Sequence, residues 1–563
     1  MTAMTAIPAS QRVKLPTQQQ KSLALTYHRL MLMMLVFAGV TFLIVMRLVM
    51  LQISTDRSVV AAGDPLLPAR GDLVDRNGAP LARTIDAWSI YVHPNKLIGD
   101  PEELAVKLSE LMPERSAAEY LKILKSGKGF VYLNRRALPE LVSAVNALGE
   151  PAIEFAREPE RLYPQTQLAA HLLGWTDFDG RGVSGIEKML DGRLLDPALR
   201  GAPVALSIDS RVQAVMETEL GAAMEKHQAE GAAGIVLDVR TGEVLALASF
   251  PTFNPNAAGQ FEANSQYNRA TMGVYELGST FKPLTVAAAL DAGTITSLAR
   301  RYDAGSALAI GRFRITDYKG KNRPLNVAEV LAYSSNIGTA RIADEMGVER
   351  LTASFRKLGF DKTAQIELRE KSRPLWPAQW SRATLLTGAF GHGLAVTPLH
   401  LATAYAALVN GGVSRPATVL KVEPGKAPAG HRVFSEETSR RMRQLLRLNV
   451  LHGGGKNGEA KGYRVGGKTG TAEKSSASGY SKKVNVSTFA SAFPMDDPRY
   501  VVVAMLDAPK ATADTFGYTT AGWVSAPIVS KVVGRTGSLL GVTPDHHRDV
   551  DVSELLPLLN VRK

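Results

Sequence analysis

One long apolar segment near the N-terminus constrains this chain more than any other feature. Residues 30–46 contain no charged side chain, and apolar residues continue past Arg47 as far as Leu51. A helix needs about 20 apolar residues to cross a lipid bilayer, and an arginine near one end can extend to the headgroups. No small-x-small cleavage site follows the segment, which argues against a cleaved signal peptide. The sequence therefore predicts a single transmembrane helix at residues 30–51.

The charges before this segment predict its orientation. Residues 1–29 carry Arg12, Lys14, Lys21 and Arg29 but no Asp or Glu. Because positive charge is retained on the cytoplasmic side of a membrane, we expect a cytoplasmic tail at residues 1–29 and the bulk of the chain outside. The whole chain has a net charge of +13, which suits anionic partners. A location outside the cell membrane argues against nucleic acid as that partner.

The composition excludes several kinds of chemistry. At 563 residues the chain is too long for one ordinary domain. It contains no cysteine, which excludes disulfides, a cysteine nucleophile and thiolate-bound zinc or iron–sulfur clusters. Its ten histidines form no H-x-x-x-H pair, and His392, which lies between two glycines, is expected in a tight loop. We therefore expect no metal and no other cofactor.

Strand and helix patterns divide the chain after residue 51 into two parts. Residues 52–209 mix short strand-like and helical runs. From residue 234 onward, strand patterns stand at both ends of a mostly helical region. These patterns predict a hairpin at residues 235–248 and further strands at residues 466–472, 488–493 and 500–506.

This order of elements predicts a multidomain α+β protein. Strands at both ends of a helical region, which includes a helical pattern at residues 331–346, indicate an antiparallel sheet built from distant parts of the sequence. We place this second domain at residues 210–542 and the first at residues 52–209. Residues 543–563 are expected to form a poorly ordered tail.

A serine and a lysine three residues apart, Ser279 and Lys282, follow Gly278 and precede a helical run. Positions i and i+3 lie on one helix face, so the lysine amine can reach the serine hydroxyl. A serine needs a base to become a nucleophile, and a lysine serves as one only if its pKa is lowered. We predict that Ser279 is the nucleophile and Lys282 the general base. A second copy, Ser354–Lys357, lies in an amphipathic helical pattern and is expected to be structural.

Two further motifs follow in order along the chain. Ser334-Ser335-Asn336 opens a helical stretch, and alone it is explained as a helix N-cap. Lys468-Thr469-Gly470-Thr471 lies at a predicted strand, and alone it is explained as a strand end. Together, an S-x-x-K, an S-x-N and a K-T-G element in this order are the motif set of penicillin-binding proteins and class A β-lactamases.

The three motifs can assemble into a site for acyl transfer. Lys468 supplies a second cation that keeps Lys282 neutral and can pair with a substrate carboxylate. Ser334 can relay a proton between Lys282 and a leaving amine, and Asn336 can hold a peptide carbonyl. The backbone N–H groups of Ser279 and Thr471 can form an oxyanion hole. Thr469, Gly470 and Thr471 can contact the substrate.

With these motifs the chain resembles the class B penicillin-binding proteins, the monofunctional D,D-transpeptidases of cell-wall synthesis. Leu277 departs from the family, in which proline is usual at that position, and the change should leave the chemistry intact. The resemblance implies an elongated pedestal at residues 52–209 and a transpeptidase domain of the penicillin-binding and serine β-lactamase type at residues 210–542. Outside the motifs it rests on residues 69–82, 161–164, 171–174, 185–187 and 396–399.

The resemblance also implies a reaction. Ser279 would attack a D-Ala-D-Ala stem peptide of nascent peptidoglycan and release D-alanine, as in serine-type D-Ala-D-Ala carboxypeptidases, and an amine of a neighbouring strand would take the acyl group. β-Lactam antibiotics would acylate the same serine. Asn336, which is often Asp in elongation-type relatives, and a compact pedestal favour the septal subgroup.

The septal assignment implies further partners. They are a septal glycosyltransferase of the SEDS family (FtsW type) and other membrane proteins of the division machinery, with the catalytic domain in the periplasm and the anchor in the inner membrane. The alternatives are an elongation-specific transpeptidase, a β-lactamase and a non-catalytic penicillin sensor. The predicted membrane span and pedestal, and the lack of an evident E-x-x-L-N element after Asn336, argue against a β-lactamase.

Overall fold

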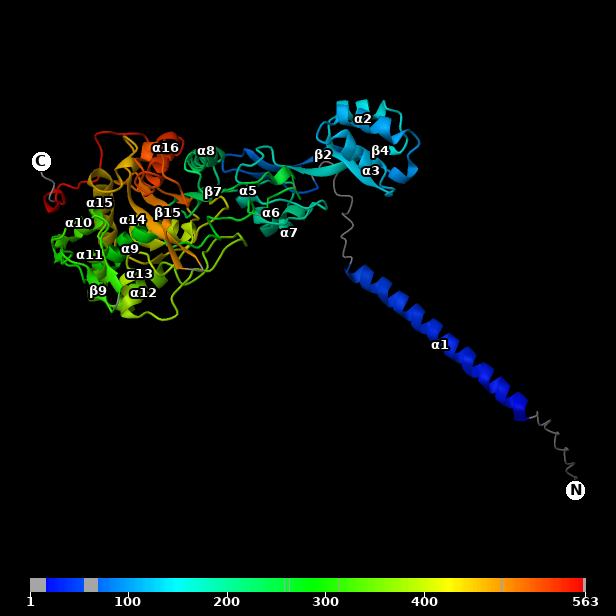
Figure 1. Cartoon of the computed structure of the whole chain (residues 1–563), viewed down its shortest axis with the longest axis horizontal. Helices are drawn as coiled ribbons and strands as arrows, with labels where there is room; N and C mark the ends of the chain where they lie inside the picture. Colours follow the sequence, from blue (N-terminus) through cyan, green and yellow to red (C-terminus); the bar gives the residue numbers. More distant parts are fainter. Residues whose placement is uncertain are drawn as a thin grey trace, which may run out of the picture. The chain divides into compact units, whose positions relative to one another are not determined.

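The computed structural model describes residues 17–54, 69–257, 259–262, 264–311, 313–476 and 479–559. The chain falls into two compact units, of which the first ends at Leu67 and the second begins at Pro68. The first unit holds one long helix, and the second holds all the sheets of the described residues (Figure 1).

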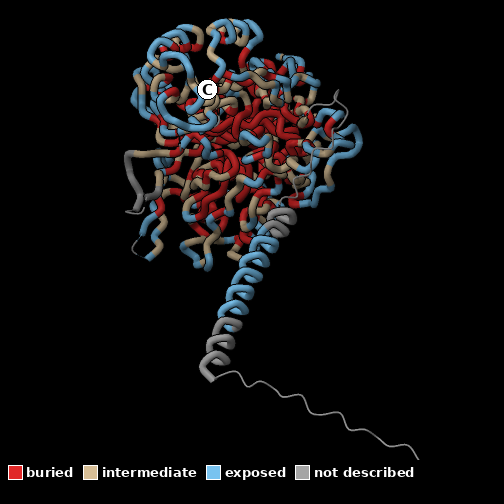
Figure 2. Tube along the Cα trace, turned by 90° about the vertical axis from the view of Figure 1, so that its right-hand side faces the viewer, coloured by how far each residue is buried: buried red, intermediate tan, exposed pale blue. Residues whose placement is uncertain are grey.

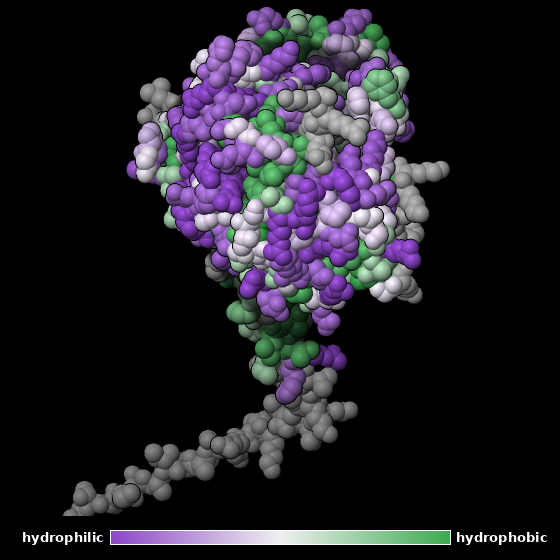
Figure 3. All heavy atoms as spheres, turned by 90° about the vertical axis from the view of Figure 1, so that its left-hand side faces the viewer, coloured by the Kyte–Doolittle hydropathy of each residue, from purple (hydrophilic) through white to green (hydrophobic). Residues whose placement is uncertain are grey.

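Helix α1 (Thr17–Ser54) forms the described part of the first unit. Its segment His28–Arg47 is long and apolar enough to cross a membrane. The residues of this segment are exposed (Figure 2), and Figure 3 shows the coloured part of the helix as mostly hydrophobic, whereas hydrophilic side chains cover most of the visible face of the second unit. Exposed apolar surface of this extent is unfavourable in water and is typical of a surface that contacts lipid or protein. The helix fits the membrane anchor predicted at residues 30–51.

A five-stranded sheet in the order β3–β2–β1–β5, with β4 paired to β2, opens the second unit. Apolar side chains of the helices that follow share one core with those of β2 and β3. The strands are β1 (Leu73–Val74), β2 (Pro80–Val92), β3 (Val131–Ala137), β4 (Ile153–Leu162) and β5 (Val204–Ala205), and the helices are α2 (Pro101–Leu111), α3 (Ala117–Leu124) and α4 (Pro139–Asn146).

Buried ion pairs connect distant segments of the β1–β5 part of the second unit. Glu187 is fully buried, and its carboxylate accepts hydrogen bonds from Arg70 Nε at 2.6 Å and from Arg161 Nε at 2.8 Å. A buried charge is costly unless it is paired, so the three residues depend on one another. They come from three of the segments on which the family resemblance rests. The short helices around them are α5 (Ala170–Leu173), α6 (Gly185–Met189) and α7 (Asp191–Leu195).

The rest of the second unit contains a five-stranded antiparallel sheet in the order β14–β15–β16–β6–β7. The predicted hairpin forms β6 and β7, and the predicted late strands form β14, β15 and β16. Because β16 pairs with β6, the sheet joins distant parts of the sequence, as predicted. The bounds are β6 (Gly231–Asp238), β7 (Val244–Phe250), β14 (Gly466–Ser476), β15 (Gly479–Phe493) and β16 (Tyr500–Asp507).

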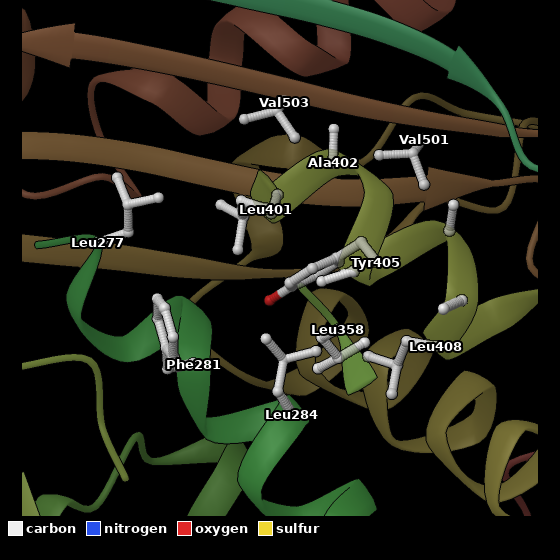
Figure 4. Close-up of a cluster of buried hydrophobic side chains, with 14 of the residues drawn as sticks. Leu277, Phe281, Leu284, Leu358, Leu401, Ala402, Tyr405, Leu408, Val501 and Val503 are labelled. Carbon is white, nitrogen blue, oxygen red and sulfur yellow. The ribbon is translucent and has the colours of Figure 1, made fainter. Parts of the chain in front are cut away.

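Helices cover both faces of this sheet. Alternate residues of a strand point to opposite faces. On β16, Val501 and Val503 face the core that contains α14 (Pro398–Val409), where Figure 4 shows them beside Leu401 and Tyr405. Val502 faces the other core, which contains apolar side chains of α8 (Ser210–Lys226) and α16 (Ser525–Thr536). The predicted sheet flanked by helices is therefore confirmed.

The helical pattern at residues 331–346 forms two helices instead of one. Ser334 has a φ of +58°, a left-handed conformation that interrupts a helix, and it separates α10 from α11. The helices of this region are α9 (Lys282–Asp291), α10 (Val327–Ala332), α11 (Asn336–Met346), α12 (Val348–Lys357), α13 (Arg382–Gly388) and α15 (Glu436–His452). Short strands accompany them: β8 (Arg301–Tyr302), β9 (Leu308–Ile310), β10 (Phe313–Ile315), β11 (Leu325–Asn326), β12 (Val413–Ser414) and β13 (His431–Arg432).

The expectation of a poorly ordered C-terminal tail is wrong for residues 543–559. Leu555 and Leu559 are each only 4% exposed and belong to the larger core. Asp549 pairs with Arg447 of α15 at 2.7 Å. Apolar side chains spaced along this segment pack against the edge of the core. The charged residues between them hide this apolar pattern in the sequence. Residues 560–563 lie outside the described residues.

Candidate active site

The predicted nucleophile lies in a tight turn. Ser279 belongs to the 3₁₀ turn Gly278–Phe281, and α9 begins directly afterwards at Lys282. Gly278 has a φ of +53°, and a Cβ on it would lie 3.0 Å from the Thr471 carbonyl oxygen. Only glycine meets both conditions without strain. Gly278 therefore allows the chain to turn sharply directly before the serine.

Buried side chains of the core pack against this turn. Phe281 is fully buried, and Figure 4 shows it beside Leu284 and Tyr405. The Tyr405 hydroxyl donates a hydrogen bond to the Thr280 carbonyl oxygen at 2.8 Å. Because Tyr405 is also fully buried, this bond satisfies a polar group that would otherwise be costly. The residue next to the nucleophile is thus fixed by both packing and a hydrogen bond.

The break between α10 and α11 places neighbouring residues of the Ser334–Asn336 motif in different surroundings. Ser335 is the N-cap of α11, and its Oγ accepts a hydrogen bond from Gly338 N at 2.9 Å. Ser334 lies outside both helices, so its hydroxyl can point into the site. The N-cap interpretation is therefore confirmed for Ser335, and the side chain of Ser334 is left available for the predicted function.

Ser334 Oγ is the centre of the site. It is 3.1 Å from Ser279 Oγ, 3.1 Å from Lys282 Nζ and 3.0 Å from Lys468 Nζ, all within hydrogen-bonding distance. Lys282 Nζ also donates to the Ser334 carbonyl oxygen at 2.5 Å. Among the described residues no hydrogen bond joins Lys282 Nζ directly to Ser279 Oγ. The direct contact expected from the i, i+3 spacing is replaced by one that passes through Ser334.

Both lysines of the site are buried. Lys282 is 0% and Lys468 1% exposed, and neither forms an ion pair with a carboxylate within the described part of the chain. Burial lowers the pKa of Lys282 well below its ordinary value, and the positive charge of Lys468 lowers it further. Burial also lowers the pKa of Lys468, to about 7. A neutral Lys282 is able to accept a proton.

Lys468 reaches the site from β14, one of the two edge strands of the five-stranded antiparallel sheet. Side chains alternate along a strand, so Lys468 and Gly470 face one side and Thr469 and Thr471 the other. A Cβ on Gly470 would lie 2.3 Å from the Leu277 carbonyl oxygen, so the strand passes close to the nucleophile turn only because this residue is glycine.

The remaining predicted site residues lie around this centre. Thr471 Oγ1 accepts a hydrogen bond from Ala521 N at 3.0 Å, and Asn336 Nδ2 donates to the Thr316 carbonyl oxygen at 3.0 Å. Thr469 is partly buried. No hydrogen bond joins these three side chains to Ser279, Ser334 or either lysine within the described ranges.

Two other candidates behave as the sequence predicts. Ser354 lies inside the amphipathic helix α12, whose buried side is formed by Leu351, Thr352 and Phe355. His392 lies in a tight loop between two glycines with positive φ, and its Nδ1 is 2.9 Å from Glu276 Oε2. This bond to Glu276 raises the pKa of His392. Among the described residues no cluster of His, Asp and Glu is placed to hold a metal ion.

Sequence reasoning missed two residues that shape the site. Tyr405 lies in a mostly apolar helix, and a buried tyrosine hydroxyl needs a hydrogen-bond partner. That need was the feature of the sequence that could have identified Tyr405. Asp317 lies in the loop after β10, where its carboxylate accepts hydrogen bonds from Ser335 Oγ at 2.6 Å and from Ile337 N at 3.0 Å. No motif surrounds Asp317, so nothing in the sequence indicated this contact.

Comparisons with known proteins agree on both folded parts. Residues 232–534 match the model of the penicillin binding protein transpeptidase domain, and residues 65–194 match that of the penicillin-binding protein dimerisation domain. The chain is 42% identical over 484 residues to a probable peptidoglycan D,D-transpeptidase FtsI of Caulobacter vibrioides, with 84% of this chain and 82% of the relative covered. It is 31% identical over 555 residues to peptidoglycan D,D-transpeptidase FtsI of Escherichia coli K12, with 91% of each covered.

Solved structures give the same result. The chain resembles penicillin-binding protein 3 of Mycobacterium tuberculosis in complex with aztreonam, with a TM-score of 0.67 and 27% identity over 85% of this chain and 98% of that one. The ampicillin complex of the same protein matches with a TM-score of 0.67 and 27% identity over 86% of this chain and 99% of the other.

Proposed function

The chain belongs to the penicillin-binding protein transpeptidase family, as a class B member of the division-specific FtsI type, and from this we propose that it cross-links peptidoglycan stem peptides at the division septum through an acyl-enzyme on Ser279. The family resemblance inferred from the sequence motifs is thereby confirmed, together with the two-part fold that it implied. The roles of individual residues belong to the proposal.

One observation carries the proposed mechanism, namely that Ser334 Oγ lies within 3.1 Å of both Ser279 Oγ and Lys282 Nζ. Both hydroxyls can rotate, so a proton can pass from Ser279 to Ser334 while Ser334 gives its own proton to the neutral Lys282 amine. Ser279 Oγ then forms a bond to the carbonyl carbon of the penultimate D-alanine. The peptide C–N bond breaks, and the proton returns through Ser334 to the departing D-alanine amine.

The second half of the reaction uses the same groups in the opposite direction. An amine of a neighbouring stem peptide attacks the ester carbon and gives its proton to Lys282 through Ser334. The bond between the acyl carbon and Ser279 Oγ then breaks, and the proton returns through Ser334 to Ser279 Oγ. If water attacks instead, the product is that of a D-Ala-D-Ala carboxypeptidase. The backbone N–H groups of Ser279 and Thr471 would stabilise the oxyanion in both steps.

Edge strand β14 provides the surface for the substrate. An exposed strand edge can pair with an extended peptide, so a stem peptide can lie along Lys468–Thr471 with its carbonyl near Ser279. The ammonium of Lys468 would pair with the terminal carboxylate, with the hydroxyls of Thr469 and Thr471 nearby and Asn336 holding a peptide carbonyl. The solved relative in complex with aztreonam or ampicillin supports β-lactams as ligands that acylate Ser279.

Helix α1 supports a placement in the inner membrane. With residues 1–29 in the cytoplasm, the pedestal at residues 52–209 and the transpeptidase domain at residues 210–542 would lie in the periplasm. There the protein would meet nascent peptidoglycan, a SEDS-family glycosyltransferase of the FtsW type and other division proteins of the membrane. The four positive charges before the span support this orientation.

The test uses the purified full chain and a stem peptide that ends in D-Ala-D-Ala. We expect release of D-alanine, formation of a cross-linked product when an acceptor amine is added, and a long-lived adduct with fluorescent penicillin. Rapid hydrolysis of penicillin without D-alanine release would indicate a β-lactamase, and no adduct would indicate neither enzyme. Depletion in the source cell should give filaments, whereas spherical cells would assign the protein to elongation.

A further inference from the structure

A loop with no recognisable motif contacts the segment that carries Ser334. The loop follows β10, and Asp317 within it accepts hydrogen bonds from Ser335 Oγ at 2.6 Å and from Ile337 N at 3.0 Å. The preceding residue, Thr316, accepts a hydrogen bond from Asn336 at 3.0 Å through its carbonyl oxygen. Three consecutive residues after Ser334 are thus attached to two consecutive residues of one loop.

Ser334 needs such an attachment because its backbone is strained. A serine seldom adopts a φ of +58°, and such conformations persist only where the surrounding structure enforces them. On the side of α10, Ser334 N donates to the Leu331 carbonyl oxygen and Ser335 N donates to that of Val330. On the side of α11, Asp317 holds the next turn. The strained residue is therefore fixed from both directions.

We propose that Asp317 is a positioning residue of the transpeptidation site, which holds Ser334 in the conformation from which its hydroxyl reaches Ser279 and both lysines. The inference rests on the proposed function, in which Ser334 carries the proton. Asp317 touches none of the reacting atoms, and it acts through Ser335 and the first turn of α11.

The side chain of Asp317 differs from the rest of its loop. Its neighbours Tyr318 and Lys319 are exposed, whereas Asp317 is partly buried. Among the described residues it forms no ion pair with a lysine or arginine. Its two oxygens instead accept hydrogen bonds from the Ser335 hydroxyl and the Ile337 backbone N–H. Asp317 therefore fixes the start of α11 and differs from a solvated surface charge.

The carboxylate has a second effect that makes the inference testable. Two charged groups act on Lys282 from the elements packed against it, namely Lys468 on β14 and Asp317 on the loop. Burial and Lys468 lower the pKa of Lys282, and Asp317 raises it. Removal of the Asp317 charge therefore lowers this pKa further, so that Lys282 stays neutral to a lower pH. A purely structural defect would reduce the rate without this shift.

The experiment measures the second-order rate of acylation by penicillin against pH for the full chain and three variants. Asp317→Asn keeps the shape and one acceptor but removes the charge, and Asp317→Ala removes both. Asp303→Asn is the matched control, because Asp303 is also a loop carboxylate that contacts α11, through an ion pair with Arg341 at 3.1 Å. Thermal unfolding of each variant serves as the control that it is folded.

We expect Asp317→Ala to lose on the order of a hundredfold in plateau rate, as misplacement of a proton-relay group does. Asp317→Asn should lose less and should move the acidic limb to lower pH, while Asp303→Asn matches the wild type. Wild-type rates in both Asp317 variants would overturn the inference, and so would a lower rate with an unmoved limb in Asp317→Asn. If the wild type itself is not acylated, the proposed function fails instead.

Discussion

Lys282 and Lys468, two buried lysines from a helix and a distant strand, donate hydrogen bonds to the same oxygen, Ser334 Oγ, at 3.1 and 3.0 Å. Two ammonium groups so close together and out of water cannot both be charged without a large cost. The arrangement therefore favours one neutral and one charged lysine. It also makes the protonation of each lysine depend on the other, which two substitutions of Lys468 can examine.

Replacing Lys468 by alanine should impair the base and the carboxylate contact at once. Without the Lys468 charge, and with water able to enter the space, the pKa of Lys282 rises toward its ordinary value of about 10.4. Acylation by a β-lactam should then be far slower at neutral pH, with its acidic limb at higher pH. The pH dependence of the second-order acylation rate measures this. An unmoved limb would mean that burial alone adjusts Lys282.

Lys468→Arg separates the two functions of this residue. The pKa of Lys468 is lowered to about 7, so its charge is lost as the pH rises through neutrality and binding of a carboxylate should weaken above that point. An arginine stays charged at every accessible pH but cannot occupy the same space. We expect a rate lower by on the order of a hundredfold and no basic limb. A basic limb that persists unchanged would assign it to another group.

Ser334→Gly is the sharpest test of the proton relay. Glycine adopts a φ of +58° without strain, so the variant should be at least as stable as the wild type in thermal unfolding. Its acylation rate should nevertheless fall by about 10²- to 10⁴-fold, the usual contribution of general acid–base catalysis. A stable variant that is acylated at the wild-type rate would show that Lys282 reaches Ser279 without Ser334.

Sequence patterns predict best what is fixed locally in this chain. The hairpin of β6 and β7 and the strands β15 and β16 follow from alternation and turn residues, which act over a few positions. The structure brings the motif residues Ser279, Lys282, Ser334 and Lys468 together, and their roles stay a prediction. The sequence does not predict the route between them, because Ser279 lies in a 3₁₀ turn and its hydroxyl meets Ser334, a contact across 55 positions that only the tertiary fold sets.

The errors have the same physical origin. The helical pattern at residues 331–346 is interrupted where Ser334 has a φ of +58°, and the residues that follow it contact a remote loop. The C-terminal segment is ordered because Leu555 and Leu559 find a core built by other parts of the chain. Both features depend on partners that are distant in the sequence.

The division into two units predicts that the second is independent of the first. Deletion of residues 1–67 should give a soluble protein that is acylated at the wild-type rate, since the deletion removes the exposed apolar helix and no residue of the site. Solubility after removal of detergent and the rate of penicillin acylation are the two measurements. A truncated protein that stays insoluble or inactive in every buffer would show that the helix completes the fold.

The central claim is that Ser279 carries the acyl group, and peptide mass mapping after reaction with penicillin tests it most directly. The matched variants are Ser279→Ala and Ser354→Ala, which change one serine each in two copies of the same S-x-x-K pattern. We predict one penicillin adduct per chain on the peptide that contains Ser279, in the wild type and in Ser354→Ala, and none in Ser279→Ala. An adduct on any other residue, or one that persists in Ser279→Ala, would contradict the account.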